Sequence, residues 1–272
     1  DGRKIRHSSP RPDSDRAEHP RRRRPRRTGS ALITPGQPCL HRPCREIGWK
    51  PIETMKKILT IVILLSSIHL YGQKPVKVAC IGDSVTYGSL IEDRENNSYP
   101  AQLQRMLGDR YEVGNFGKPS ATVLKKGHCP YMESQEFTDA LSFSGDIAVI
   151  HLGLNDTDPR NWPNYGNEFT SDYLALIDSV RASNPDVRVL IALLSPVTPK
   201  HPRYNTGTME WHAAIQKEIT AIAETAQVEL IDFNSRLLSR PDLLPDSVHP
   251  TAEGAGILAD IVFQAISGRS DF

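Results

Sequence analysis

The fold class is decided by residues 76–84, VKVACIGDS. Residues 76–81 form a compact apolar run with the length of a β-strand, and Gly82 ends it. A glycine permits a tight turn from a strand into a helix, and such a turn lifts a following serine hydroxyl clear of the sheet. The stretch therefore predicts a buried strand that delivers Ser84 to the start of a helix.

The same alternation of short apolar runs and longer helical patterns continues along the chain. Further strands are predicted at residues 111–115, 146–152, 187–194 and 228–233, and helices at residues 99–107, 169–182, 209–226 and 250–267. Strands that alternate with helices form βαβ units, whose right-handed crossovers create a parallel sheet. The sequence thus predicts an α/β domain with a five-stranded parallel sheet over residues 73–272.

Four short motifs stand at the ends of predicted strands or before the last helix. They are Gly82-Asp83-Ser84, Asn115-Phe116-Gly117, Gly153-Leu154-Asn155-Asp156 and Asp246-Ser247-Val248-His249. In open α/β sheets, ligands bind outside the carboxyl ends of the strands. We therefore expect the four motifs to converge on one edge of the sheet.

Three of the residues in these motifs have the chemistry of nucleophilic catalysis. A neutral His249 can take the proton of Ser84 and return it to a leaving group. Asp246 lies three residues before His249, so a loop can fold its carboxylate onto the other ring nitrogen and fix the tautomer. The set predicts ester hydrolysis through an acyl-serine. The alternatives are a helix-capping serine, a turn aspartate and an exposed loop histidine.

Two further residues are candidate donors for a developing oxyanion. Gly117 offers an unhindered backbone N–H and Asn155 a side-chain amide, which with the N–H of Ser84 would make a three-donor site. Asn155 also fits an ordinary turn at a strand end. Trp162 and Tyr165 are candidates for an aromatic wall against a sugar ring, although the sequence favours ordinary loop packing for both.

The formal net charge of +1 hides two halves of opposite sign. Residues 1–54 hold 14 Lys and Arg against 6 Asp and Glu, a net of +8, whereas residues 55–272 hold 19 against 26, a net of −7. The acidic body does not suggest nucleic acid as a partner. Residues 1–54 have little apolar periodicity, so we expect them to be disordered. Because Met55 opens a different segment, we interpret them as upstream sequence; the alternative is a basic arm for an anionic partner.

Residues 55–72 have the pattern of a secretory signal peptide. Lys56 and Lys57 precede an apolar run at residues 58–70, and a small-residue cleavage point follows near Gly72. The run is shorter than the roughly 20 apolar residues that span a membrane. We expect a secreted or periplasmic protein without stable membrane insertion. A buried helix and an uncleaved anchor are the alternatives.

The four cysteines carry little information about function. Cys39 and Cys44 lie in the basic leader, Cys80 is predicted to be buried in the first strand, and Cys129 lies in a loop. A Cys80–Cys129 disulfide would need an oxidising compartment. No Cys or His spacing is typical of a metal site, so we expect neither a metal nor an organic cofactor.

Taken together, the four motifs resemble the blocks of the SGNH (GDSL) hydrolase superfamily, in that superfamily's order. The resemblance implies a flavodoxin-like three-layer α/β/α sandwich. It also implies Ser84 as nucleophile, His249 as base, Asp246 as its partner, and Ser84, Gly117 and Asn155 as the oxyanion hole. Many relatives carry a further glycine after the second block, where this chain reads Lys118-Pro119-Ser120, so we expect the pocket floor to differ.

A narrower resemblance concerns the substrate. Residues 84–100 resemble those of secreted bacterial carbohydrate O-acetylesterases, including sialate and xylan esterases. This implies deacetylation of a carbohydrate. A lysophospholipase or thioesterase of the same superfamily and a catalytically silent carbohydrate-binding module are the alternatives, because kinship of fold does not fix substrate. The sequence predicts no oligomeric state.

Overall fold

The computed structural model describes residues 55–60 and 74–268 of the chain. Residues 55–60 form a short stretch of exposed helix and are described by themselves. The leader expected at residues 1–54 lies outside the described residues. Of the signal peptide expected at residues 55–72, only residues 55–60 are described. Across the described ranges, no helix is both long and apolar enough to cross a membrane.

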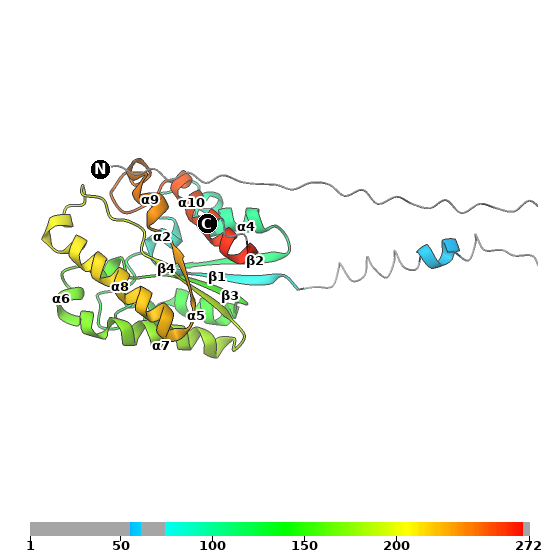
Figure 1. Cartoon of the computed structure of the whole chain (residues 1–272), viewed down its shortest axis with the longest axis horizontal. Helices are drawn as coiled ribbons and strands as arrows, with labels where there is room; N and C mark the ends of the chain where they lie inside the picture. Colours follow the sequence, from blue (N-terminus) through cyan, green and yellow to red (C-terminus); the bar gives the residue numbers. More distant parts are fainter. Residues whose placement is uncertain (1–54, 61–73, 269–272) are drawn as a thin grey trace, which may run out of the picture. The chain divides into compact units, whose positions relative to one another are not determined.

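The centre of the domain is a five-stranded sheet with parallel strands in the order β2-β1-β3-β4-β5 (Figure 1). Its strands are β1 (Val76–Gly82), β2 (Tyr111–Gly117), β3 (Ile147–His151), β4 (Arg188–Leu193) and β5 (Glu229–Asp232). All five residues of β3 are buried, as expected for an apolar strand with helices on both faces. The predicted five-stranded parallel sheet is confirmed.

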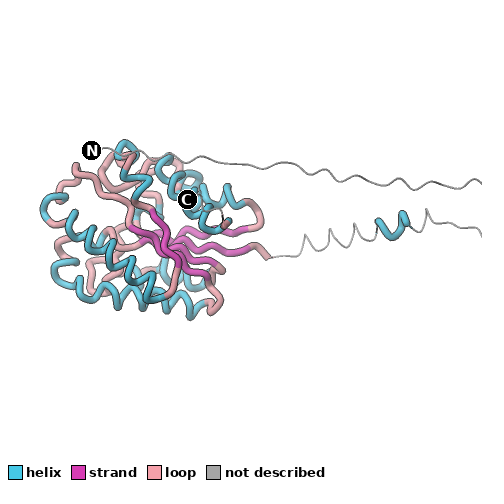
Figure 2. The backbone as a smooth tube through the Cα atoms, in the orientation of Figure 1, coloured by secondary structure: helices cyan, strands magenta, loops and turns pink. Residues whose placement is uncertain are grey.

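Helices cover both faces of this sheet and make a three-layer α/β/α sandwich (Figure 2). They are α2 (Ser84–Tyr87), α3 (Arg94–Asn97), α4 (Tyr99–Leu107), α5 (Gln135–Phe143), α6 (Trp162–Tyr165), α7 (Phe169–Ser183), α8 (Thr208–Ala226), α9 (Ser235–Leu238) and α10 (Ala252–Ser267). In Figure 1, α4 and α10 pack together on one face, and α5, α7 and α8 lie on the other. The layers match the predicted fold.

Two local features differ from the sequence expectations. Helix α5 was not predicted; it begins where Ser134 accepts a hydrogen bond from the N–H of Phe137. The last helix begins at Ala252 rather than at residue 250, because Thr251 is extended and its hydroxyl accepts from the N–H of Gly254. Side-chain caps therefore set both helix starts.

The turn after β1 can be made only by glycine. A Cβ at Gly82 would lie 2.0 Å from the Thr86 hydroxyl and 2.7 Å from the His151 carbonyl oxygen. The chain therefore passes directly from the strand into α2, and Ser84 emerges at the carboxyl edge of the sheet.

Both cysteines in the part of the chain that the structure describes are free. Cys80 is buried in β1, as predicted, and burial raises the pKa of its thiol to about 12. Cys129 is partly exposed, and the Cys80–Cys129 disulfide considered from the sequence is not formed.

Candidate active site

Ser84 is the first residue of α2, directly after β1 and its turn. The carboxylate of Asp83 caps this helix by accepting a hydrogen bond from the N–H of Val85 at 2.9 Å. The cap fixes the backbone on both sides of Ser84. Because the first N–H groups of a helix have no partner within it, the Ser84 amide is available to an anion.

The structure brings Ser84, His249 and Asp246 into one chain of hydrogen bonds. The Nε2 atom of His249 lies 2.8 Å from the Oγ of Ser84, which is 165 positions away in sequence. Its Nδ1 atom lies 2.6 Å from Oδ2 of Asp246. Oδ1 of Asp246 also accepts from the backbone N–H groups of His249 and Val248, at 2.7 and 3.1 Å. These hydrogen bonds therefore fix the orientation of the Asp246 carboxylate relative to the His249 ring.

The charge of Asp246 follows from these contacts. Partial burial on its own would raise the pKa of the carboxyl group, but the hydrogen bonds from the His249 ring and from two backbone N–H groups outweigh it, so the pKa lies below its usual value. Ionised Asp246 accepts a hydrogen bond from the Nδ1–H group of His249. Nε2 is then left as the acceptor for the hydroxyl proton of Ser84, which is the tautomer that a general base requires.

Asn155 lies at the same edge, in the single-turn helix that follows β3 (Asn155–Thr157). Its amide Nδ2 donates to the carbonyl of Ala121 at 3.0 Å, which fixes the orientation of the side chain. An amide nitrogen carries two protons, and within the described ranges Nδ2 has no second acceptor. Asn155 lines a cavity of about 490 Å³ together with Ser84 and His249.

Gly117 does not have the position that the sequence suggested for it. It is the last residue of β2, its N–H donates to Oδ1 of Asn115 at 3.0 Å, and it is not among the residues that line the cavity. The N–H of Lys118 donates to the carbonyl of Gly82, so the ladder with β1 extends past Gly117. The Gly117 N–H is therefore already paired and does not face the cavity.

Ser120 is the residue of this loop that lines the cavity beside Ser84 and Asn155. Its backbone has a φ of 69°, in the left-handed region that favours glycine. Among the described residues, its N–H donates no hydrogen bond. Sequence reasoning noted Ser120 only as a departure from the glycine of many relatives, and that departure marks the residue that reaches the cavity.

Buried polar side chains tie the loop after Ser120 to the loop after β3. Asp156 is fully buried and accepts from the N–H groups of Val123 and Leu124, at 3.0 and 2.9 Å. Burial raises the pKa of this carboxyl group to about 7, although the two N–H groups lower it in part. The Asp156 carboxylate therefore joins its own loop to the backbone at Val123 and Leu124.

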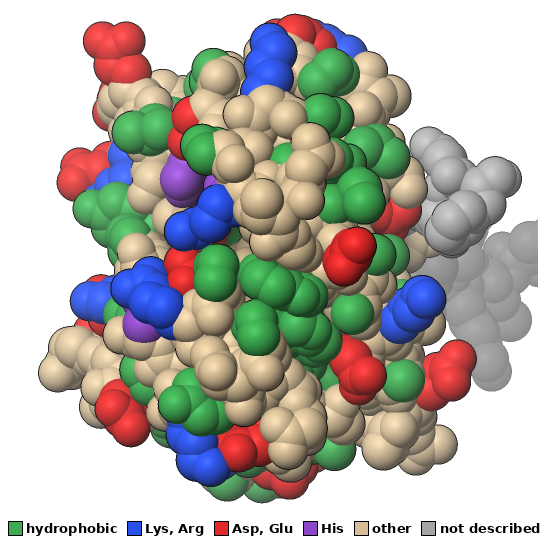
Figure 3. Space-filling model, turned by 90° about the vertical axis from the view of Figure 1, so that its left-hand side faces the viewer, with side chains coloured by type: hydrophobic (Ala, Val, Ile, Leu, Met, Phe, Trp, Pro, Cys, Tyr) green, Lys and Arg blue, Asp and Glu red, His purple; other side chains and the backbone are tan. Residues whose placement is uncertain are grey.

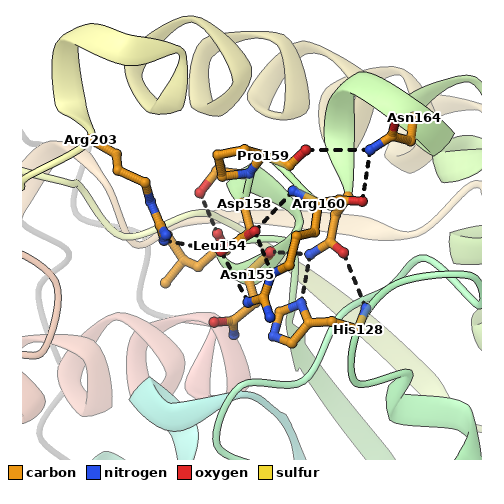
Figure 4. A network of polar contacts seen from close by, with 10 residues as sticks. His128, Leu154, Asn155, Asp158, Pro159, Arg160, Asn164 and Arg203 are labelled. Carbon is orange, nitrogen blue, oxygen red and sulfur yellow. Dashed lines mark hydrogen bonds and ion pairs between the residues drawn. The ribbon is translucent and has the colours of Figure 1, made fainter.

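A further contact between the two loops, of Asn161 with Asn155 and His128, was not predicted from the sequence. Figure 4 shows His128 close to Asn155. The Nδ2 atom of Asn161 lies 2.7 Å from the carbonyl oxygen of Asn155 and 2.9 Å from Nδ1 of His128. Its Oδ1 accepts from the N–H of His128 at 3.1 Å. Polar residues scattered through two loops give no periodic signal, so only the folded structure reveals this contact.

Trp162 and Tyr165 do not line the cavity. Trp162 packs edge-to-face on Phe169, with ring centroids 5.5 Å apart, and Tyr165 lies beside the ammonium group of Lys126. The structure therefore agrees with loop packing rather than with an aromatic wall. Across the described ranges, no group of acidic, His or Cys side chains is arranged to hold a metal ion.

Behind Ser84 lies a buried pair of titratable groups. Nδ1 of His151 is 3.8 Å from Oδ1 of Asp83, and both side chains are fully buried. Burial raises the pKa of Asp83 to about 7 and lowers the pKa of His151 to about 3. Nε2 of His151 accepts from the N–H of Ser195 at 3.1 Å, so the neutral ring carries its proton on Nδ1. The pair is therefore neutral between about pH 3 and pH 7.

This pair predicts a specific dependence of stability on pH. Between about pH 4 and pH 7 the unfolded chain loses the Asp83 proton while the folded chain keeps it, so the Asp83 contribution to stability falls as pH rises. His151 acts in the opposite direction, because only the unfolded chain gains a proton as pH falls below 6.5. The variant Asp83→Asn removes the first effect alone and keeps the cap on Val85.

Relative to wild type, Asp83→Asn should gain roughly 1.4 kcal/mol in free energy of unfolding for each pH unit across this window. Urea denaturation at several pH values measures the difference. Asp109→Asn, at an exposed turn, serves as the control for loss of one surface carboxylate. Parallel curves for wild type and Asp83→Asn would show that Asp83 is already ionised in the folded protein.

Comparison with known proteins bears on this site. The model of the GDSL-like Lipase/Acylhydrolase family matches residues 80–257. An acetylxylan esterase from Xylanibacter ruminicola is 35% identical over 218 residues, which are 74% of this chain and 45% of that protein. The chain therefore spans somewhat less than half the length of this curated relative.

Solved structures share the fold at lower identity. The acetyl xylan esterase AlAXEase superposes with a TM-score of 0.56 at 21% identity, over 70% of this chain and 100% of that one. The native aryl esterase of M. smegmatis gives 0.57 at 18% identity, over 72% and 100%. Est24, a carbohydrate acetylesterase from Sinorhizobium meliloti, gives 0.53 at 20% identity, over 71% and 99%.

The resemblance seen in the sequence motifs is thus confirmed. Because the family match runs from β1 into α10 and includes all four motifs, this chain belongs to the GDSL-like lipase/acylhydrolase family.

Proposed function

We propose that this protein is a serine ester hydrolase that removes acetyl groups from carbohydrate. The observation that carries the proposal is the unbroken chain of hydrogen bonds from Ser84 through His249 to Asp246 at a cavity of about 490 Å³. Membership of an acylhydrolase family and the similarity to an acetylxylan esterase support it.

The first half of the reaction makes an acyl-enzyme. Oγ of Ser84 bonds to the ester carbonyl carbon while its proton passes to Nε2 of His249, and the carbonyl oxygen becomes an oxyanion. Ionised Asp246 stabilises the imidazolium that forms. His249 then gives this proton to the sugar oxygen as the carbon–oxygen bond breaks, leaving acetyl-Ser84 and a free hydroxyl.

The second half repeats these steps with water in place of the sugar. His249 takes a proton from the water, the hydroxide bonds to the acetyl carbon, and the proton returns to Oγ of Ser84 as acetate departs. In both halves the oxyanion is held by the N–H of Ser84, the N–H of Ser120 and the amide of Asn155. This assigns to Ser120 the role that the sequence suggested for Gly117.

The cavity lining favours a small acyl group on a polar alcohol. Serine, threonine, asparagine, histidine and arginine side chains contribute most of the lining. The apolar contributions are scattered, from Leu90, Pro119, Leu154, Val197 and Val248. A long acyl chain gains its binding energy from burial of consecutive methylene groups, at about 0.8 kcal/mol each, and needs a continuous apolar channel. The lining supports an acetylesterase over a lysophospholipase or long-chain thioesterase.

The test of this function is a screen of acyl and alcohol groups. Acetate release from acetylated xylan, acetylated sialic acid and p-nitrophenyl acetate is compared with hydrolysis of p-nitrophenyl palmitate, lysophosphatidylcholine and palmitoyl-CoA. We expect turnover of the acetyl esters and at least about 100-fold lower kcat/KM for the long-chain substrates. Preference for a long chain would contradict the proposal, and binding of acetylated sugar without turnover would identify a silent binding module.

We also propose that the protein is exported, on the strength of the sequence of residues 55–72. N-terminal sequencing of the mature protein from its native source should find a start near residue 73. Recovery of peptides from residues 1–54 in that protein would contradict both the export and the interpretation of those residues as upstream sequence.

A prediction for the oxyanion site follows from the amide of Asn155. Asn155→Ala should lower kcat for p-nitrophenyl acetate by about 10²- to 10³-fold, because one donor to the transition state is lost. Asn184→Ala is the matched control, since its Nδ2 also donates to a distant backbone carbonyl, that of Gly145, at 3.0 Å. Asn184 does not line the cavity. Equal losses of activity in the two variants would mean that Asn155 acts through folding alone.

A further inference from the structure

Two arginines at the cavity share one carboxylate (Figure 4). Nε and Nη2 of Arg160 lie 2.8 and 3.2 Å from the two oxygens of Asp158, and Nη2 of Arg203 lies 3.1 Å from Oδ2 of the same group. All three residues line the cavity that contains Ser84. The Asp158 side chain is only 8% exposed, whereas those of Arg160 and Arg203 are 64% and 49% exposed.

These three groups leave an uncompensated positive charge. Hydrogen bonds from Arg160, and the charge of Arg203, hold the pKa of Asp158 at about 2, so this carboxylate is ionised and neutralises only one guanidinium. No other Asp or Glu is among the described residues that line the cavity. The surplus stands out because residues 55–272 carry a formal net charge of −7.

The arrangement also leaves hydrogen-bond donors free in a fixed position. A guanidinium has five N–H groups. Arg160 and Arg203 use theirs only toward Asp158, and Nη1 of each has no acceptor among the described residues. Asp158 therefore orients two planar donor groups at the cavity without saturating them. Paired N–H groups of this kind match the two oxygens of a carboxylate.

A histidine adds a neutral donor to the same wall. His201 lines the cavity, and Nδ1 of its ring accepts from the N–H of Arg203 at 3.3 Å. Burial, and then the charge of Arg203, lower the pKa of His201, so the ring is neutral at physiological pH. With Nδ1 as acceptor, its proton is on Nε2.

The charge is different on the other side of the catalytic histidine. A second cavity, of about 460 Å³, shares Leu90 and His249 with the first, and its charged lining residues are Glu92 and Asp93. An anionic group on the substrate is therefore attracted to the arginine side and repelled from the other.

Figure 3 shows the face of the molecule that lies on the left-hand side of Figure 1. His side chains lie next to Lys or Arg side chains on that face.

We propose that Arg160 and Arg203 bind a carboxylate carried by the substrate, so that the preferred acetyl ester lies on or beside an acidic sugar. The proposal rests on the acetylesterase function proposed above and names its substrate class. Two sources have this chemistry: a uronic acid branch next to the acetylated residue of a polysaccharide, and an acetylated sialic acid that carries its own carboxylate.

Kinetics with charged and neutral substrate pairs test this assignment. One pair consists of acetylated xylo-oligosaccharides with a glucuronic acid or a glucose branch, and the other of O-acetylated sialic acid and its carboxamide. The wild type should prefer at least one acidic member by about tenfold or more in kcat/KM, through KM, and added salt should reduce this preference. The pair that shows it identifies the source of the carboxylate.

The variants Arg203→Gln and Arg160→Gln should each lower the ratio of acidic to neutral kcat/KM by about tenfold, and Arg203→Lys should restore part of it. The ratio is independent of the fraction of folded enzyme. Arg236→Gln, which loses an ion pair with Asp260 outside the cavity, is the matched control and should leave the ratio unchanged. Equal kcat/KM within both wild-type pairs, or a ratio that neither arginine variant moves, would overturn the carboxylate site.

Binding to Ser84→Ala separates this proposal from the proposed function. Titration calorimetry compares the acidic and neutral members of each pair without turnover. Tighter binding of an acidic member, lost in Ser84→Ala/Arg203→Gln, would support the carboxylate site even if no acetate were released by the wild type. Turnover of neutral and acidic esters at equal rates, with equal binding, would leave the esterase standing and remove the carboxylate site.

Discussion

Ser84→Ala is expected to lower kcat for p-nitrophenyl acetate by about 10⁴- to 10⁶-fold. The variant removes the atom that bonds to the acyl carbon, and no acyl-enzyme can then form. Steady-state hydrolysis of the aryl acetate measures the loss, with single-turnover experiments to exclude a change in product release.

Ser89→Ala is the matched control for this prediction. Ser89 lines the same cavity, and its backbone N–H donates to the carbonyl of Ser84, but its hydroxyl is not bonded to His249. We expect its activity to stay within a few-fold of wild type. Wild-type rates in Ser84→Ala, with the fold intact by circular dichroism, would show that another nucleophile carries the reaction.

Asp246→Asn is expected to have the second-largest effect, a fall in kcat of about 10³- to 10⁴-fold. The amide oxygen can still accept from the N–H groups of Val248 and His249, so the loop keeps its shape. The amide nitrogen would face Nδ1 of His249 with a proton and drive the ring into the tautomer protonated on Nε2. That tautomer cannot accept the proton of Ser84, and no carboxylate stabilises an imidazolium.

The chain offers a matched control for this variant in Asp232. Oδ1 of Asp232 accepts from the N–H groups of Asn234 and Ser235, at 2.7 and 3.0 Å, in a turn like that of Asp246 but without a histidine partner. Asp232→Asn should keep nearly all activity. Comparable activity in Asp246→Asn and wild type would contradict a role of the carboxylate in orienting His249.

Local patterns predicted most of the scaffold. Continuous apolar runs located the strands, because a parallel strand with helices on both faces is buried along its whole length. The bounds of α4 and α7 were predicted to within one residue, because their apolar residues recur at helical spacing. Helix α5 was missed, since it depends on a single capping serine and on packing against other elements.

The meeting of Ser84, Asp246 and His249 at one edge of the sheet was predicted better than the surroundings of these residues. Ser84, Asp246 and His249 were found because each has a distinctive motif at a strand end or before a helix, and a parallel sheet brings such positions to one edge. The residue of the loop after β2 that reaches the cavity was not predicted. It depends on how far the pairing of β2 with β1 extends. It extends past Gly117 and leaves Ser120 at the cavity.

The residues that bind the two loops together give no signal in the sequence. Asn161, His128 and the arginines at Asp158 come from loops whose spacing follows neither a helix nor a strand. Two of their contacts join positions more than 30 residues apart, that of Asn161 with His128 and that of Arg203 with Asp158. Only the folded chain shows that His128, Asp158 and the two arginines line one cavity.

The most direct test of the central claim is covalent capture of the nucleophile. The purified protein is treated with a fluorophosphonate, and the adduct is located by peptide mass spectrometry, in wild type, Ser84→Ala and Ser89→Ala. We predict one adduct per chain, on Ser84, with loss of aryl acetate hydrolysis in proportion to labelling and no adduct in Ser84→Ala. Full labelling of another residue, or full hydrolytic activity after complete labelling of Ser84, would contradict the acyl-serine mechanism.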